Sequence, residues 1–140
     1  MIRPILAAGL AVLTCFPVQS HAQQFIERDR IEIPIVPIDA NTFEAIENDG
    51  AGGTAMWCAA GLYTREVLGQ RGGSIYIQQG RSASVAVPGR KSVVFSTQPV
   101  DGAFSSLSQG IRRTGKVFSM AHAYALCRET PRLRVEIVGR

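Results

Sequence analysis

The feature that most constrains this fold is a pair of cysteines, Cys58 and Cys127, the only two that follow residue 22. Residues 1–22 have the pattern of an export signal, and paired thiols in exported proteins usually form a disulfide. We therefore predict a disulfide that closes a loop of about 70 residues. The chain-entropy model gives such a cross-link about 4 kcal/mol against a total stability of about 5–15 kcal/mol.

Residues 1–22 are predicted to be a cleaved signal peptide. Arg3 provides the positive start, residues 5–16 form an uncharged apolar run, and small residues precede position 23. The run is too short and wrongly flanked for a stable membrane span. Two alternatives stay open, an uncleaved N-terminal anchor and lipidation at Cys15. We expect a periplasmic or secreted protein that begins near Gln23 and has no transmembrane span.

Charge is divided unevenly along the chain. Residues 23–50 contain two arginines and seven acids, a net charge of −5, whereas residues 51–140 contain twelve basic residues and four acids, a net charge of +8. The simpler interpretation is an acidic arm that lies on a basic body. The alternative is that the body binds an anionic envelope component or another protein. Nucleic acid is not an expected partner, because no recognition motif is present and export would separate the two.

Residues 23–53 are predicted to form an acidic, extended N-terminal arm. Residues 31–38 alternate between apolar and other positions but contain two prolines, which indicates an extended segment or an edge strand. Asn41 suits a helix cap and Glu44 follows three residues later, so a short helix is expected there. The glycine-rich residues 48–53 would end it as a flexible joint.

Residues 54–140 are predicted to form a single α+β domain. A helix over 55–68, capped by Thr54, is apolar nearly all round, which is typical of a buried helix. A second helix is expected over 116–128, and a long, mobile surface loop over 101–115. Strands are expected over 74–78, 83–87, 92–96 and 132–137. The predicted fold is a small antiparallel sheet packed on two helices that the disulfide joins.

Arg112, Arg113 and Lys116 are the candidate contacts for an anion or a partner, because they cluster ahead of the second predicted helix. The segment Gly110–Val117 also fits the phosphate-loop pattern G-x-x-x-x-G-K. That loop needs a hydroxyl side chain after the lysine and a strand before it, and Val117 and a serine-rich segment stand there instead. We predict no cofactor, and no metal site, because His122 is the only histidine after residue 22.

The segment Trp57-Cys58-Ala59-Ala60-Gly61-Leu62-Tyr63 resembles the start of the catalytic helix in papain-like cell-wall amidases and endopeptidases. The resemblance implies that Cys58 is a nucleophile and that a histidine from a later strand is its base. This chain departs from the pattern, because Gly89-Arg90 stands where that family has glycine-histidine. The disulfide expected with Cys127 would also silence the thiol.

The layout also resembles small exported proteins of alphaproteobacteria that carry a Trp-Cys-Ala-Ala-Gly segment after a signal peptide. Residues 57–61, 68–69 and 75–77 and Cys127 carry this resemblance. It implies export, size and the cysteine pair, and it implies no site residues.

Three functional hypotheses follow, and the sequence favours the first. The chain is an exported, non-enzymatic binding or accessory protein that contacts its partner through the acidic arm and the loop 102–115. Alternatively it is a papain-like cysteine hydrolase that acts on the cell wall through Cys58. In the third hypothesis it is a peripheral subunit of a membrane complex, docked through residues 23–50.

Overall fold

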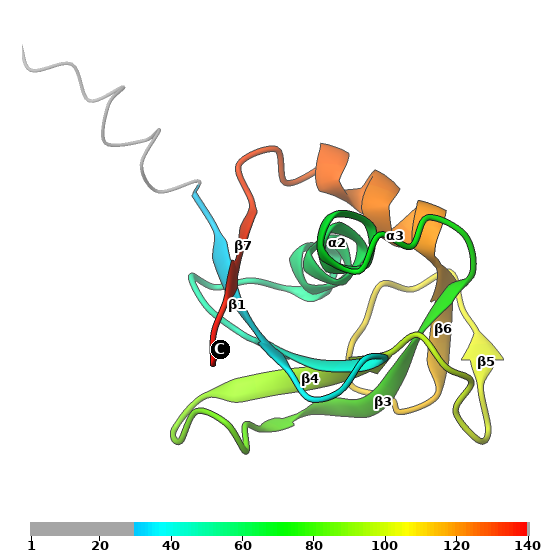
Figure 1. The fold of residues 1–140 in the computed structure, drawn as a ribbon, viewed down its shortest axis with the longest axis horizontal. Coiled ribbons are helices and arrows are strands. Elements are labelled where there is room, and N and C mark those ends of the chain that lie inside the picture. The colour runs from blue at the N-terminus through cyan, green and yellow to red at the C-terminus, as the bar shows by residue number, and fades with distance from the viewer. Residues whose placement is uncertain (1–29, 140) are drawn as a thin grey trace, which may run out of the picture.

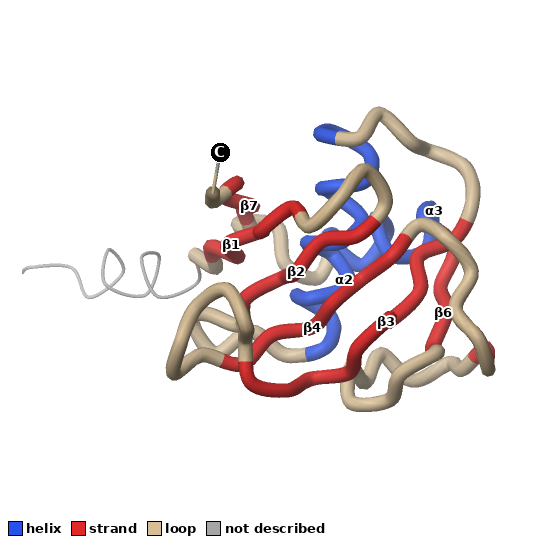
Figure 2. The backbone as a smooth tube through the Cα atoms, turned by 60° about the horizontal axis from the view of Figure 1, so that its bottom comes forward, coloured by secondary structure: helices blue, strands red, loops and turns tan. Residues whose placement is uncertain are grey.

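The computed structural model describes residues 30–139, which form one seven-stranded sheet with both helices on one of its faces (Figure 1). The strand order is β5-β6-β3-β4-β2-β1-β7, and Figure 2 shows the central strands side by side in this order. The predicted signal peptide, Cys15 and the start of the predicted arm lie outside the described residues. The strands are β1 Glu32–Pro37, β2 Thr42–Ile46, β3 Ser74–Ala83, β4 Lys91–Ser96, β5 Phe104–Ser105, β6 Lys116–Ser119 and β7 Arg134–Ile137.

The α+β class is confirmed, but the sheet is larger than predicted and mixed. The outer strands β7 and β5 pair in parallel with β1 and β6, and the other pairs are antiparallel. Parallel neighbours need a long crossover. Here the chain between β1 and β7 includes both helices. Helices packed on a sheet were predicted from the sequence, but this parallel connection was not.

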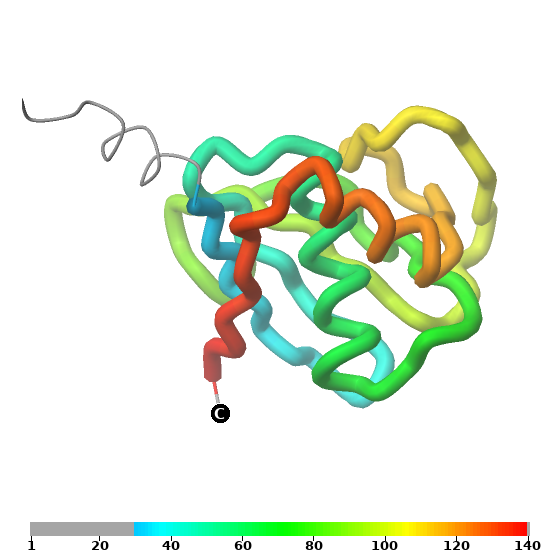
Figure 3. Tube along the Cα trace, turned by 90° about the horizontal axis from the view of Figure 1, so that it is seen from above, coloured from blue at the N-terminus to red at the C-terminus, as the bar shows by residue number. Residues whose placement is uncertain are grey.

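The helices are α2 Gly53–Leu62, continued by the π-helix η1 Tyr63–Val67, and α3 Met120–Ala125, continued by the 3-10 helix η2 Leu126–Arg128. Figure 3 shows α2 and α3 next to each other above the sheet. Every residue of α2 from 55 to 61 is buried, as its apolar circumference predicted. Trp57 is fully buried, with its ring centroid 5.2 Å from that of Phe95 on β4 and 4.3 Å from that of Phe118 on β6. The core therefore lies between α2 and the inner face of the sheet.

The two helices are joined by Cys58 and Cys127, whose Cα atoms are 4.8 Å apart and whose sulfurs are at disulfide distance, 2.14 Å. Gly61, one turn further along α2, meets the backbone of α3. A Cβ atom at this position would lie 2.5 Å from the backbone nitrogen of Tyr124. The small residue and the disulfide thus fix the same close helix crossing.

The short helix predicted after Asn41 is wrong, because residues 42–46 form strand β2. Residues 38–41 make the tight turn between β1 and β2: the N–H groups of Ile38 and Asp39 donate to the Thr42 carbonyl, at 2.9 and 3.1 Å. The Asp39 carboxylate accepts from the Asn41 N–H at 2.8 Å. The polar residues read as a helix cap are therefore turn residues, a role that Asp and Asn fill equally well.

Strand β1 is neither a separate arm nor an edge strand, because it lies between β2 and β7. It pairs with β7 through residues 32–35 and with β2 through residues 35–37. Pro34 belongs to the half that does not pair with β2, so its missing N–H interrupts no bond on that side. The described part of the predicted arm is thus built into the sheet.

Three further local predictions are wrong. The second helix begins at Met120 rather than 116, because residues 117–119 pair with β3 and Ser119 caps the helix by accepting from the His122 N–H at 3.1 Å. Strand β3 runs through the break expected between the strands 74–78 and 83–87, and residues 84–87 are not a strand. Thr54 does not cap α2: the N-cap is Gly52, and the Thr54 hydroxyl bonds the side chain of Gln109 instead.

Candidate functional site

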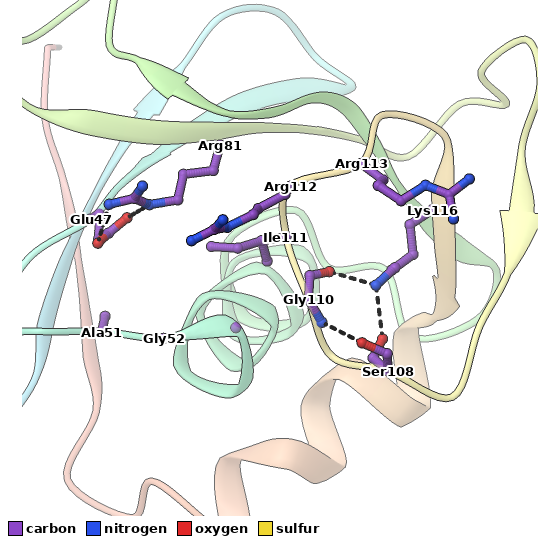
Figure 4. A pocket seen from close by; sticks show the side chains of 11 residues that line it. Glu47, Ala51, Gly52, Arg81, Ser108, Gly110, Ile111, Arg112, Arg113 and Lys116 are labelled. Atoms are coloured by element: carbon purple, nitrogen blue, oxygen red, sulfur yellow. Dashed lines mark hydrogen bonds and ion pairs between the residues drawn. The ribbon is translucent and has the colours of Figure 1, made fainter.

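A cavity of about 590 Å³ opens at the N-terminal end of α2, between that helix, β3 and the segment 108–116 (Figure 4). We call it the cationic cavity because four of its lining side chains are basic and one is acidic. Its lining residues are Glu47, Ala51, Gly52, Gly53, Arg81, Ser108, Gly110, Ile111, Arg112, Arg113 and Lys116.

Two glycines let the segment 108–115 pack directly on the structured elements. A Cβ atom at Gly53 would lie 2.0 Å from the carbonyl oxygen of Gln109, and one at Gly80 would lie 2.2 Å from that of Arg112. Only a residue without a side chain permits such an approach. The loop wall of the cavity therefore lies in van der Waals contact with both α2 and β3.

Hydrogen bonds hold the same segment along β3. The Arg81 N–H donates to the Ile111 carbonyl at 2.8 Å, and the Gly115 N–H donates to the Ile77 carbonyl at 2.8 Å. Ile111 is itself buried in the core. The sequence predicted a mobile surface loop over 101–115, but this part of it is bonded to the sheet and contributes to the core.

Lys116 lies at the base of the cavity and is only 4 % exposed. Its ammonium donates to the carbonyl oxygens of Ser108 and Gly110, at 3.0 and 2.8 Å. Burial, and secondarily the charge of Arg113, holds the pKa of Lys116 below its usual value. No carboxylate within residues 30–139 forms an ion pair with it. An ammonium has three donors, so one remains after the two carbonyl bonds.

Arg81 and Glu47 form an ion pair at the other end of the cavity. Arg81 donates from Nε to one carboxylate oxygen of Glu47 and from a terminal nitrogen to the other, the latter at 3.0 Å. The Arg81 bond lowers the pKa of Glu47, burial opposes this shift, and the charges of Arg81, Arg112 and Lys91 add to it. The pair also raises the pKa of Arg81. This end therefore holds one internal anion among several cations.

Arg112 and Arg113 extend from the loop wall in different directions (Figure 4). Arg112 is directed across the cavity toward Glu47 and Arg81, and it makes no side-chain hydrogen bond or ion pair within residues 30–139. Arg113 is directed away from them and lies over the ring of Phe104, 4.3 Å from its centroid. Of the two, Arg112 has its guanidinium available to a molecule in the cavity.

The start of α2 lines the same cavity through Gly52 and Gly53. Its N-cap Gly52 provides no side-chain hydrogen bond, and its first turn contains no acidic residue. The first intrahelical bond runs from the Met56 N–H to the Gly52 carbonyl at 3.0 Å, so the three N–H groups before it have no partner within the helix. Such N–H groups and the helix dipole favour an anion.

The structure thus brings together the three basic residues that the sequence singled out, Arg112, Arg113 and Lys116. The sequence reasoning missed Arg81, Glu47 and the helix start. The available signal was two glycines, Gly80 and Gly53, because each lies where the backbone of the segment 108–115 approaches. The residues next to them, Arg81 and Gly52, line the same cavity. In the sequence, Gly53 was interpreted only as part of a joint.

The other candidate residues do not form a site. Cys58 is fully buried and bonded to Cys127, so its sulfur is not available as a nucleophile. His122 is exposed, with its ring edge against Phe118 at 4.6 Å between centroids. Within residues 30–139 no three His, Cys, Asp or Glu side chains group to bind a metal ion.

A scan of protein-family models finds no match for the chain, and searches of curated proteins and of solved structures find none either. Among the described residues, no helix has the length and apolar character that crossing a bilayer requires. The cationic cavity is therefore the feature of the molecule that points to a function.

Proposed function

We propose that this protein is a small exported, non-enzymatic binding module that holds an anionic group of its partner in the cationic cavity. The observation that carries the proposal is the buried ammonium of Lys116, whose charge is balanced by no carboxylate in residues 30–139. A buried charge without a counter-charge is costly. A bound anion would supply the missing counter-charge.

The surroundings of Lys116 support this proposal. Arg112 lies across the same cavity with its guanidinium unbonded, and Gly52 and Gly53 at the start of α2 also line it. Guanidinium groups bind carboxylate and phosphate oxygens through two parallel hydrogen bonds. A phosphate or carboxylate group therefore finds donors of three kinds here: an ammonium, a guanidinium and backbone amides.

The exported location and the disulfide belong to the same proposal. One covalent cross-link between the helices suits a small domain outside the reducing cytoplasm. In this proposal the protein acts by presenting a preformed surface to its partner, another protein or an anionic envelope component. With Cys58 bonded to Cys127, the papain-like alternative lacks its nucleophile.

Replacing Arg112 by glutamine tests the cavity. We expect the Arg112→Gln variant to bind inorganic phosphate about tenfold more weakly, because one charge-assisted hydrogen-bond donor pair is lost. Isothermal titration calorimetry of the purified protein at low and at moderate salt gives the dissociation constants. Inorganic sulfate, acetate and choline complete the panel, and choline serves as the cationic control that should not bind.

Arg71→Gln is the matched control for this test. Arg71 is exposed and does not line the cavity, but its replacement removes the same charge from the molecule. We expect it to change the phosphate affinity less than twofold at moderate salt, where distant charges are screened. An equal loss in both variants, or no binding of any anion to the unaltered protein, would contradict the proposal.

A further inference from the structure

The cationic cavity contains an anion of its own, the carboxylate of Glu47. We infer that Glu47 is a built-in competitor of the ligand, which occupies Arg81 and so sets how tightly the cavity holds an external anion. This inference rests on the anion-binding function proposed above and names the residue that regulates it.

The pairing with Glu47 occupies two N–H donors on one edge of the Arg81 guanidinium. Both carboxylate oxygens accept from one guanidinium, through Nε and a terminal nitrogen. This is the bidentate geometry in which an arginine would bind a carboxylate or phosphate ligand. The carboxylate of Glu47 thus stands in for the group that we propose the cavity recognises.

Main-chain bonds hold Glu47 where it can compete. Its N–H donates to the Lys91 carbonyl at 2.8 Å, and its own carbonyl accepts from the Arg90 guanidinium at 2.7 Å. The residue directly follows β2, so the sheet fixes the starting point of its side chain. An anchored residue loses little further entropy on pairing, whereas an external ligand loses its translational freedom. The internal carboxylate therefore has an advantage over a singly charged ligand at Arg81.

A ligand in the cavity consequently meets Arg112, Lys116 and the start of α2 first, and it reaches the bidentate edge of Arg81 only if Glu47 leaves. The charge of Glu47 also opposes any anion placed near Arg112, because Arg112 is directed toward it. Removing this one charge should both free Arg81 and lift the repulsion. Both effects act in the same direction, toward tighter binding.

The experiment is a double-mutant cycle on Glu47 and Arg81, with inorganic sulfate as the probe and calorimetry as the readout. We expect Glu47→Gln to bind sulfate about tenfold more tightly than the unaltered protein, because a nearby like charge is lost and an arginine is freed. The double variant Glu47→Gln with Arg81→Gln should bind within about twofold of the unaltered protein. The reason is that it removes an ion pair that the ligand does not use.

Glu136→Gln is the matched control, since Glu136 is an exposed carboxylate on β7 and does not line the cavity. We expect it to leave the sulfate affinity unchanged within about twofold at moderate salt. If the double variant instead loses affinity as strongly as Arg81→Gln alone, Arg81 binds the ligand directly and the inference is wrong. The thermal midpoint of each variant verifies that it is folded.

The pH dependence provides a second readout. Sulfate keeps both of its charges in mildly acidic solution. The charged side chains around Glu47 are basic ones: Arg81 on β3, Arg90 just before β4, Lys91 at the start of β4 and Arg112 on the loop. The ion pair holds the pKa of Glu47 below its usual value, so Glu47 becomes neutral only as the pH falls below the ordinary glutamate range. Sulfate affinity should rise through this range in the unaltered protein and stay flat in Glu47→Gln.

The outcomes separate the inference from the function on which it rests. Equal sulfate affinity in the unaltered protein and in Glu47→Gln, with the Arg112→Gln loss still observed, would overturn the inference and leave anion binding in place. Absence of binding in both proteins would overturn anion binding itself. Sulfate binding by Glu47→Gln alone, with phosphate still bound by the unaltered protein, would support the inference in its strongest form, a cavity that its own carboxylate keeps closed to sulfate.

Discussion

Removing the disulfide between Cys58 and Cys127 is expected to lower the free energy of unfolding by about 4 kcal/mol. The cross-link closes a loop of about 70 residues, and opening it restores that conformational entropy to the unfolded chain. The described residues contain one ion pair, between Glu47 and Arg81, and few other restraints of this kind. Guanidinium denaturation of the protein and of the Cys58→Ala, Cys127→Ala double variant measures the difference.

The redox state can be checked on the same samples. Peptide mapping without reductant should recover the peptides of Cys58 and Cys127 as one linked species. The unaltered protein with reductant should approach the double variant in its unfolding midpoint, while the variant itself should not respond. If the unaltered protein keeps its midpoint under strong reductant with both sulfurs alkylated, the disulfide contributes no stability and this account of the fold is wrong.

The elements that could be predicted from the sequence are those whose pattern has one interpretation. Residues 55–62 of α2 are all apolar or glycine, and β4 has the apolar residues 93–95 between two serines. Both appear where expected. The cysteine pair could be predicted because only two thiols follow the predicted export signal, which leaves each of them one intramolecular partner.

The elements that were mispredicted have patterns that two structures share. In β2, Phe43 and Ile46 are three apart and suit a helix face, yet Phe43 and Ala45 also alternate as a strand does. Pairing with β1 and β4 decides between the two, and these contacts are not local in sequence. The same holds for β6, where pairing with β3 converts the first turn of an expected helix into a strand.

Only part of the candidate site could be predicted from the sequence, again because some of its contacts are not local in sequence. Arg112, Arg113 and Lys116 are close along the chain, so local reasoning finds them. Arg81 and Glu47 come from β3 and from the end of β2, and only the packing of the loop against Gly80 brings them to the same cavity. A glycine that must admit another backbone has no sequence signature apart from being a glycine within a strand.

Replacing Gly61 by alanine is expected to destabilise the protein by about 3 kcal/mol, the upper range for an overpacked contact. In an unhindered helix this change would stabilise, since glycine costs about 1 kcal/mol relative to alanine. Here the added methyl would lie 2.5 Å from the Tyr124 nitrogen and 2.8 Å from the Ala123 carbonyl carbon, so α3 must move. Gly72→Ala is the control, because a Cβ atom there meets nothing within 4 Å. It should shift the free energy of unfolding by less than about 0.5 kcal/mol.

The destabilisation caused by Gly61→Ala should depend on the disulfide. Cys58 lies one turn before Gly61 on α2, and its bond to Cys127 prevents α3 from moving away to accommodate a methyl group. In the Cys58→Ala, Cys127→Ala background the helices can separate, so Gly61→Ala should cost at least 1 kcal/mol less than in the cross-linked protein. Denaturation of the four proteins of this cycle measures the coupling. If the two costs simply add, the disulfide and Gly61 act on different contacts, and the rigid crossing of α2 and α3 is not what the cross-link maintains.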